Sequence, residues 1–94
     1  MLADKRRLRD LVSVGPVFVR DLQSLGVRSV AQLRRRSPEK LYEVFCYKTG
    51  KTQDLCCLDV FRAAVEQARN PRLPMERCQW WYWSRQRKAR DARG

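Results

Sequence analysis

Apolar residues recur at every third or fourth position through most of this chain, which is the spacing of one face of an α-helix. The clearest stripe predicts a helix over residues 54–69 and consists of Leu58, Phe61, Val65 and Ala68. Asp54 is placed to cap its start, and Asn70-Pro71 ends it, because a residue before proline disfavours helical geometry. No segment alternates with the period of two that a half-buried strand requires, so the pattern predicts an all-α fold.

Four shorter segments with the helical period precede this stripe. They occupy residues 4–12, 16–25, 30–36 and 38–47. Their ends carry helix signals: Asp4 and Ser29 are candidate N-caps, Ser37-Pro38 opens the fourth segment, and Gly26 follows the second. With 94 residues, the chain is long enough for one domain with one modest core.

An aromatic block, Trp80-Trp81-Tyr82-Trp83, follows two prolines near the C-terminus. We expect Trp80 and Trp83 to pack in the core or as a lid over it. Tyr82, or whichever ring stays exposed, would be the side chain that stacks on unpaired bases.

The residues after this block are strongly basic. Ser84 is placed to cap a last helix over residues 85–92. The expected organisation is a helical domain over residues 1–83 and a basic C-terminal helix or arm over residues 84–94.

The charge balance narrows the classes of partner. The chain has 21 Lys and Arg against 10 Asp and Glu, and a formal net charge of +11. A field of that sign attracts polyanions, so nucleic acid and an anionic membrane surface are the natural partners. We expect nucleic acid, and DNA more than RNA. A membrane surface is disfavoured, because no segment is both strongly amphipathic and aromatic on its apolar side, as a membrane-surface helix would be.

Nothing in the sequence resembles a membrane span or a signal peptide, so we expect a cytoplasmic protein. The cysteines at 46, 56, 57 and 78 are then expected to be reduced thiols. Their spacing lacks the close pairs of a zinc site, and the chain has no histidine, so we expect no metal.

No constellation of residues indicates catalysis. Cys56 and Cys57 lack a histidine base, and the carboxylates are scattered among arginines, where surface ion pairs are expected. Gly50-Lys51-Thr52 ends like a phosphate-binding P-loop, but Phe45 stands where that motif requires glycine. We therefore expect no enzyme, no cofactor and no small-molecule substrate.

The segment from Leu11 to Pro16 has the form of a helix-hairpin-helix turn, in which a short bend reverses the chain and a helix N-terminus faces a phosphate. The residues expected to offer amides are Ser13, Val14, Gly15 and Val17, with charge added by Arg20. Two positions depart from the usual pattern, because Ser13 replaces the first glycine and Val17 a frequent lysine. The alternative is that the bend merely connects two packed helices.

A weaker second turn joins the fourth and fifth segments. Its expected phosphate contacts are Lys48, Gly50, Lys51 and Thr52, and the alternative is an ordinary helix C-cap with solvated lysines. The basic arm would add contacts from Arg85, Arg87 and Lys88.

Several stretches together resemble the helix-hairpin-helix family of pathogenicity-locus or mitomycin-resistance-like proteins. They are 8–11 through Gly15-Pro16, 21–27, Ser37-Pro38-Glu39 with Leu41-Tyr42, Thr49-Gly50, 56–62, and Trp80-Trp81 with 87–89. The resemblance covers about residues 8–90 and implies a compact five-helix SAM-like domain and DNA binding, with no established activity. Leu55 departs from the family pattern, in which proline is common before Cys56.

Two functions follow from these observations. The first is non-enzymatic, sequence-nonspecific binding of nucleic acid through hairpin amides and basic side chains. The alternative is a protein-interaction adaptor that uses the Trp-rich segment, because Trp and Arg dominate protein-binding hot spots.

Overall fold

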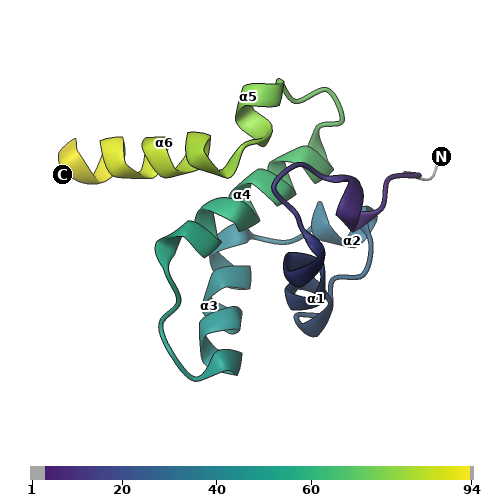
Figure 1. Ribbon diagram of the computed structural model, residues 1–94, viewed down its shortest axis with the longest axis horizontal. Helices are drawn as coiled ribbons and strands as arrows, with labels where there is room; N and C mark the ends of the chain where they lie inside the picture. The colour runs from purple at the N-terminus through teal and green to yellow at the C-terminus, as the bar shows by residue number, and fades with distance from the viewer. Residues whose placement is uncertain (1–3, 94) are drawn as a thin grey trace.

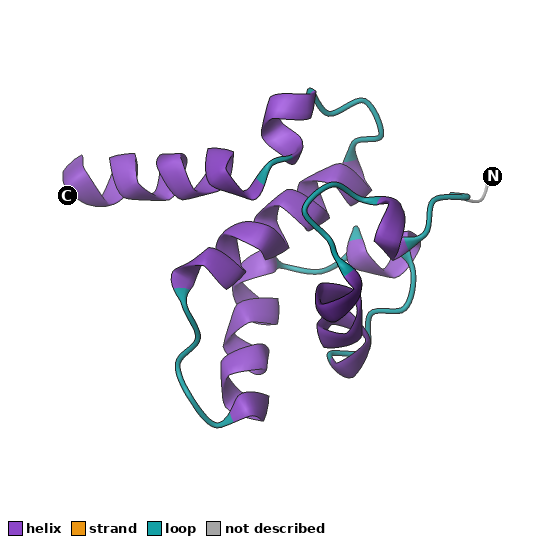
Figure 2. Ribbon diagram, in the orientation of Figure 1, coloured by secondary structure: helices purple, strands orange, loops and turns teal. Residues whose placement is uncertain are grey.

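The computed structural model describes residues 4–93, which form six α-helices and one short 3₁₀ helix and contain no β-strand (Figures 1 and 2). In chain order these are η1 (Leu8–Asp10), α1 (Pro16–Ser24), α2 (Val30–Leu33), α3 (Pro38–Thr49), α4 (Leu55–Arg69), α5 (Met75–Cys78) and α6 (Trp80–Arg93). The predicted all-α class is confirmed. The number of helices exceeds the five implied by the family resemblance, because the single turn α5 separates α4 from α6.

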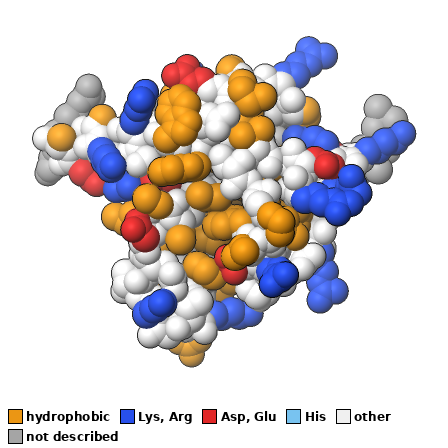
Figure 3. Space-filling model, in the orientation of Figure 1, with side chains coloured by type: hydrophobic (Ala, Val, Ile, Leu, Met, Phe, Trp, Pro, Cys, Tyr) orange, Lys and Arg blue, Asp and Glu red, His pale blue; other side chains and the backbone are white. Residues whose placement is uncertain are grey.

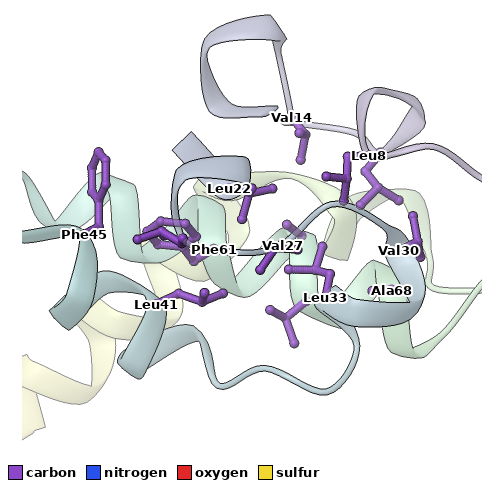
Figure 4. Close-up of a cluster of buried hydrophobic side chains, with 14 residues drawn as sticks. Leu8, Val14, Leu22, Val27, Val30, Leu33, Leu41, Phe45, Phe61 and Ala68 are labelled. Carbon is purple, nitrogen blue, oxygen red and sulfur yellow. The ribbon is translucent and has the colours of Figure 1, made fainter. Parts of the chain in front are cut away.

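The core surrounds α4, whose predicted apolar stripe is buried as expected. Phe61 is fully buried at its centre, with ring centroids 4.8 Å from Phe18 and 5.9 Å from Phe45. Leu22 and Leu41 reach the same centre from α1 and α3 (Figure 4). Truncating a buried phenylalanine of this kind to alanine costs about 3–5 kcal/mol, so Phe61 holds these three helices together.

Three predicted helix caps are confirmed. The Ser29 hydroxyl accepts from Gln32 N–H at 3.1 Å, and the Asp54 carboxylate accepts from Cys56 N–H at 2.9 Å. The Ser37 hydroxyl accepts from the backbone N–H three residues later at 3.4 Å. These side chains satisfy amides that have no partner within their own helices, and so they fix where α2, α3 and α4 begin.

The predicted helix over residues 4–12 is wrong, because it shrinks to the single turn η1. Asp4 caps no helix. Its carboxylate accepts from the Arg6 backbone N–H at 3.0 Å and pairs with the Arg6 guanidinium at 2.7 Å. Arg6 in turn donates to the carbonyls of Gln67 at 2.8 Å and Ala68 at 3.3 Å, at the end of α4. Contacts to a distant helix end therefore hold this segment extended.

The C-terminal helix begins earlier than predicted. α6 runs unbroken from Trp80, so Ser84 is a buried residue inside it and not its cap. The expected boundary between residues 83 and 84 falls within this helix, which packs along α4 before its last turns extend past it (Figure 1). The expected basic arm is thus a helix attached to the core.

Candidate nucleic-acid interface

The bend that precedes α1 is held from two sides. From α4, the Gln67 amide accepts from Val12 N–H at 2.9 Å and donates to Val12 O at 2.8 Å. From the start of α6, the Ser13 hydroxyl accepts from Trp80 N–H at 3.1 Å, and it donates to Cys78 O at 3.2 Å. Ser13 itself has a φ of 71°, in the left-handed region that glycine adopts more easily. The bend is therefore a rigid part of the fold.

One of the amides expected to meet a phosphate is already engaged within the bend. The Val14 amide donates to Leu11 O at 3.2 Å, and the Val14 side chain is buried in the core. The expectation for Val14 is therefore corrected. The Ser13 hydroxyl is directed into the protein by its two hydrogen bonds, whereas the expectation for the Ser13 amide stays a prediction.

The start of α1 remains open. Gly15 is its N-cap residue and provides no side-chain cap, Pro16 occupies the first turn, and this turn contains no acidic residue. The amides of Val17 and Phe18 have no partner within the helix, because the first turn of any helix leaves its N–H groups unpaired. Gly15 and Val17 are exposed, and exposed Arg20 lies one turn further along the helix. An anion placed here would meet amides, the positive end of the helix dipole and a guanidinium.

The second turn has no comparable group of amides. Gly50, with a φ of 74°, ends α3 in the left-handed conformation, and its N–H donates to Tyr47 O at 3.2 Å. The Lys51 N–H donates to Cys46 O at 3.2 Å. Lys48 donates through Nζ to the carbonyl of Ser24 at the end of α1. The expected phosphate site is corrected to a helix C-cap, which directs the backbone amides inward.

Thr52 and the side chain of Lys51 are exposed beside this cap. At the start of the next helix, the Cys56 N–H donates to the Asp54 carboxylate and the Cys57 N–H donates to Asp54 O, so these two amides are already engaged. The exposed lysine therefore contributes charge alone.

One residue predicted in the basic arm has a structural role. Arg87 pairs with the fully buried Asp59 of α4 through Nε and Nη2, at 3.1 Å and 3.0 Å. Its side chain is 14% exposed. The Nε–Nη2 edge is committed to the buried carboxylate and little of the side chain remains exposed, so the expectation that Arg87 contacts a phosphate is corrected to a role in the fold.

The outward face of α6 carries Trp81, Arg85 and Lys88, all exposed. They lie at positions i, i+4 and i+7, which places them in one stripe along the helix. The Arg85 guanidinium lies 4.8 Å from the centre of the Trp81 ring. Such cation–π contacts contribute about 0.5–1 kcal/mol at exposed sites and hold the ring in place.

The aromatic block is arranged differently from the prediction. Trp80 is 39% exposed, and no tryptophan in the described chain belongs to the buried core. Tyr82 packs edge-on against Trp83 at 5.1 Å and lies under Arg77, while Trp83 Nε1 donates to Arg77 O at 2.8 Å. Tyr82 is thus committed to a local cluster, and the exposed rings are Trp80 and Trp81.

Sequence reasoning missed a basic hollow beside η1. It has a volume of about 500 Å³ and is lined by Asp4 and five cations, Lys5, Arg6, Arg7, Arg9 and Arg28. The run of basic residues on both sides of buried Leu8 is a signal for it, because a short turn displays them around one side chain. Figure 3 shows Lys and Arg side chains at both ends of this face of the molecule, with hydrophobic side chains gathered between them.

Several other cations are engaged in the fold. Arg36 donates to Leu25 O at 2.7 Å, after the end of α1. Arg69 donates to the carbonyls of Arg34 and Arg36, both at 3.1 Å, after the end of α2. Cations at helix C-termini satisfy unpaired carbonyls and complement the dipole, so part of the positive charge stabilises the helices.

The cysteines form no disulfide in the described chain. Burial raises the pKa of the Cys57 and Cys78 thiols, and the hydrogen bond with Asp54 raises the pKa of Cys56. Each of these shifts disfavours a nucleophilic thiolate. Within residues 4–93, no three acidic or cysteine side chains gather where a metal ion would need them. The helices of the same part of the chain are too short or too polar to cross a bilayer.

Comparison with known proteins places this geometry in a family. The family model described as Pathogenicity locus (Cdd1) matches residues 2–89. The chain belongs to the Pathogenicity locus family. It is also 37% identical over 87 residues to a protein named mitomycin resistance protein McrB from Streptomyces lavendulae, and the match covers 92% of this chain and 78% of that relative. No solved structure matches the chain.

This membership confirms the resemblance to the pathogenicity-locus and mitomycin-resistance-like proteins. The match from residue 2 to residue 89 includes most of α6, so Trp81, Arg85 and Lys88 all lie within the region that defines the family.

Proposed function

We propose that this member of the family binds nucleic acid, DNA in preference to RNA, through the sugar-phosphate backbone and without reading the base sequence. The observation that carries the proposal is the open start of α1 at Gly15, where a rigid bend leaves first-turn amides uncapped. Free amides and the positive end of a helix dipole favour a phosphate at this position. Contacts of this kind go to the backbone, so they do not distinguish bases.

The charge of the chain supports the same function. The net charge is +11. An ion pair takes up one positive and one negative side chain, so this excess of positive charge remains even when every Asp and Glu is paired. Exposed cations close in sequence to the open helix start and to the exposed rings include Arg20, Arg85 and Lys88. We propose a non-catalytic role in the cytoplasm, where the thiols would stay reduced.

A salt titration tests this proposal. The dissociation constant for a labelled 20-bp duplex would be measured by fluorescence anisotropy at several salt concentrations. We expect a linear log–log plot with a slope of about −0.9 for each phosphate contacted. Arg20→Ala is expected to reduce the magnitude of that slope by about 0.9, whereas Lys51→Ala, at the capped second turn, leaves it unchanged. Undetectable binding to duplex and single-stranded DNA in low salt would contradict the proposal.

The alternative function is a protein-interaction adaptor, and the exposure of Trp80 and Trp81 favours it. Large aromatic side chains with a nearby arginine are frequent anchors of protein interfaces. The two functions are separated by a pair of variants. Gly15→Asp lowers the affinity for duplex DNA tenfold or more under the first function, while Trp81→Ala leaves duplex binding intact; the reverse result favours the adaptor.

A further inference from the structure

We propose that the Trp81–Arg85–Lys88 face of α6 binds unpaired nucleotides, so that the preferred ligand is a duplex with a single-stranded extension. This inference rests on the proposed function and names its substrate class. The occupant is a single strand of nucleic acid, whose bases stack on Trp81 and whose phosphates meet the two cations.

The chemistry of this face matches that ligand. Trp81 is 37% exposed, and Arg85 holds its ring from 4.8 Å. A tryptophan fixed in this way loses little conformational freedom when a base stacks on it, because its orientation is already set. A side chain four residues along a helix lies about 6 Å further on, so a cation follows the ring at the scale of one nucleotide. Aromatic rings between cations are typical of surfaces that bind single strands without sequence preference.

The charge of the face distinguishes this ligand from an acidic or an apolar peptide. Single strands present flat bases and a negative charge at every step, and this face offers one exposed ring with two cations in a single stripe. An apolar helix docking here would have to cover both charged side chains, which is costly without acidic partners.

The position of the face explains why duplex and single strand would be bound together. The first residue of α6, Trp80, donates its N–H to Ser13, which lies two residues before the open start of α1. The beginning of α6 and the bend are therefore joined directly by this hydrogen bond. A duplex end held at the bend would have its unpaired extension within reach of Trp81.

The test compares two labelled probes with the full chain, a blunt 12-bp hairpin duplex and the same duplex with an eight-thymidine extension. We expect the extension to increase affinity about tenfold, as one base–aromatic stack does. Trp81→Ala should remove that increase and leave the affinity for the blunt probe unchanged. Tyr47→Ala is the matched control, because Tyr47 is an aromatic residue that is 87% exposed on a different helix, α3.

A conservative variant provides an independent readout. Stacking quenches tryptophan emission, so Trp81→Phe should weaken the quenching caused by the extended probe while keeping most of the added affinity. Equal affinity of the wild-type chain for both probes would overturn this inference and leave the proposed function standing. An equal loss in Trp81→Ala and Tyr47→Ala would also overturn it. Failure to bind either probe would contradict the proposed function itself.

Discussion

The hydroxyl of Ser13 accepts a hydrogen bond from the backbone N–H of Trp80 at 3.1 Å, although the two residues lie 67 positions apart in the sequence. The same hydroxyl donates to Cys78 O at 3.2 Å. A single side chain thus joins the bend before α1 to the beginning of α6. The geometry of the proposed interface depends on this junction, because it fixes the open helix start beside the exposed tryptophans.

Ser13 variants test the junction. Ser13→Ala removes both hydrogen bonds and keeps the left-handed φ of 71°, so we expect a loss of about 1–3 kcal/mol in the free energy of unfolding. Ser13→Gly loses the same bonds but relieves the backbone strain, so it should be more stable than the alanine variant by about 1 kcal/mol. Urea denaturation measures both values. A glycine variant that is less stable than the alanine variant would show that the strained φ does not exist in solution.

The pair between Asp59 and Arg87 gives a second prediction. Asp59 is fully buried, so Arg87→Ala leaves an uncompensated carboxylate in the core and should cost about 3–5 kcal/mol. Replacing both partners, as in Asp59→Leu with Arg87→Met, should recover most of that loss, because no buried charge remains. Chemical denaturation of the single and double variants forms the test. If Arg87→Ala cost less than about 1 kcal/mol, the arginine would be an exposed residue and would return to the list of phosphate contacts.

The contact between Asp4 and Arg6 predicts a specific pH dependence. Hydrogen bonds from the Arg6 side chain and backbone lower the pKa of Asp4 from 3.8 to about 2. A carboxyl whose pKa is depressed in the folded state contributes stability that is complete above pH 3.8 and is lost as the pH falls towards 2. We expect Asp4→Asn to flatten the fall in stability across that window, measured by urea denaturation at intervals of half a pH unit. Identical pH profiles for the variant and the wild-type chain would contradict this contact.

Much of the fold could be predicted from local sequence patterns. The α4 stripe and the caps at Ser29, Ser37 and Asp54 depend on neighbours within a few residues, so spacing alone identified them. The errors fall where distant contacts decide. Residues 4–7 stay extended because Arg6 reaches the end of α4. Helix α6 begins at Trp80 and not at Ser84. The Trp80 N–H donates to the Ser13 hydroxyl, a distant partner that local sequence patterns do not reveal.

The candidate site was predictable in outline and not in its atoms. Glycine followed by proline marked the open start of α1 correctly. Three other expectations failed because composition does not reveal which polar groups are already engaged. The Val14 amide bonds to Leu11 O, the Gly50 amide closes α3, and Arg87 faces a buried carboxylate.

Two substitutions at Gly15 test whether the open start of α1 holds a phosphate. Nothing lies within 4 Å of a Cβ added there, and its φ of −88° suits an N-cap residue, so both Gly15→Asp and Gly15→Ser should fold. Each should raise the free energy of unfolding by a few tenths of a kcal/mol, because each caps the free amides. Their effects on DNA binding should differ, since the aspartate also places a negative charge where a phosphate would sit.

The decisive measurement is the affinity of the wild-type chain and these two variants for the same duplex in low salt. We expect Gly15→Asp, although at least as stable as the wild-type chain, to lose tenfold or more in affinity. Gly15→Ser should lose less than Gly15→Asp, because its hydroxyl competes for the same amides without adding a negative charge. Equal affinities of all three proteins would contradict the account, because the start of α1 would then play no part in holding the phosphate backbone.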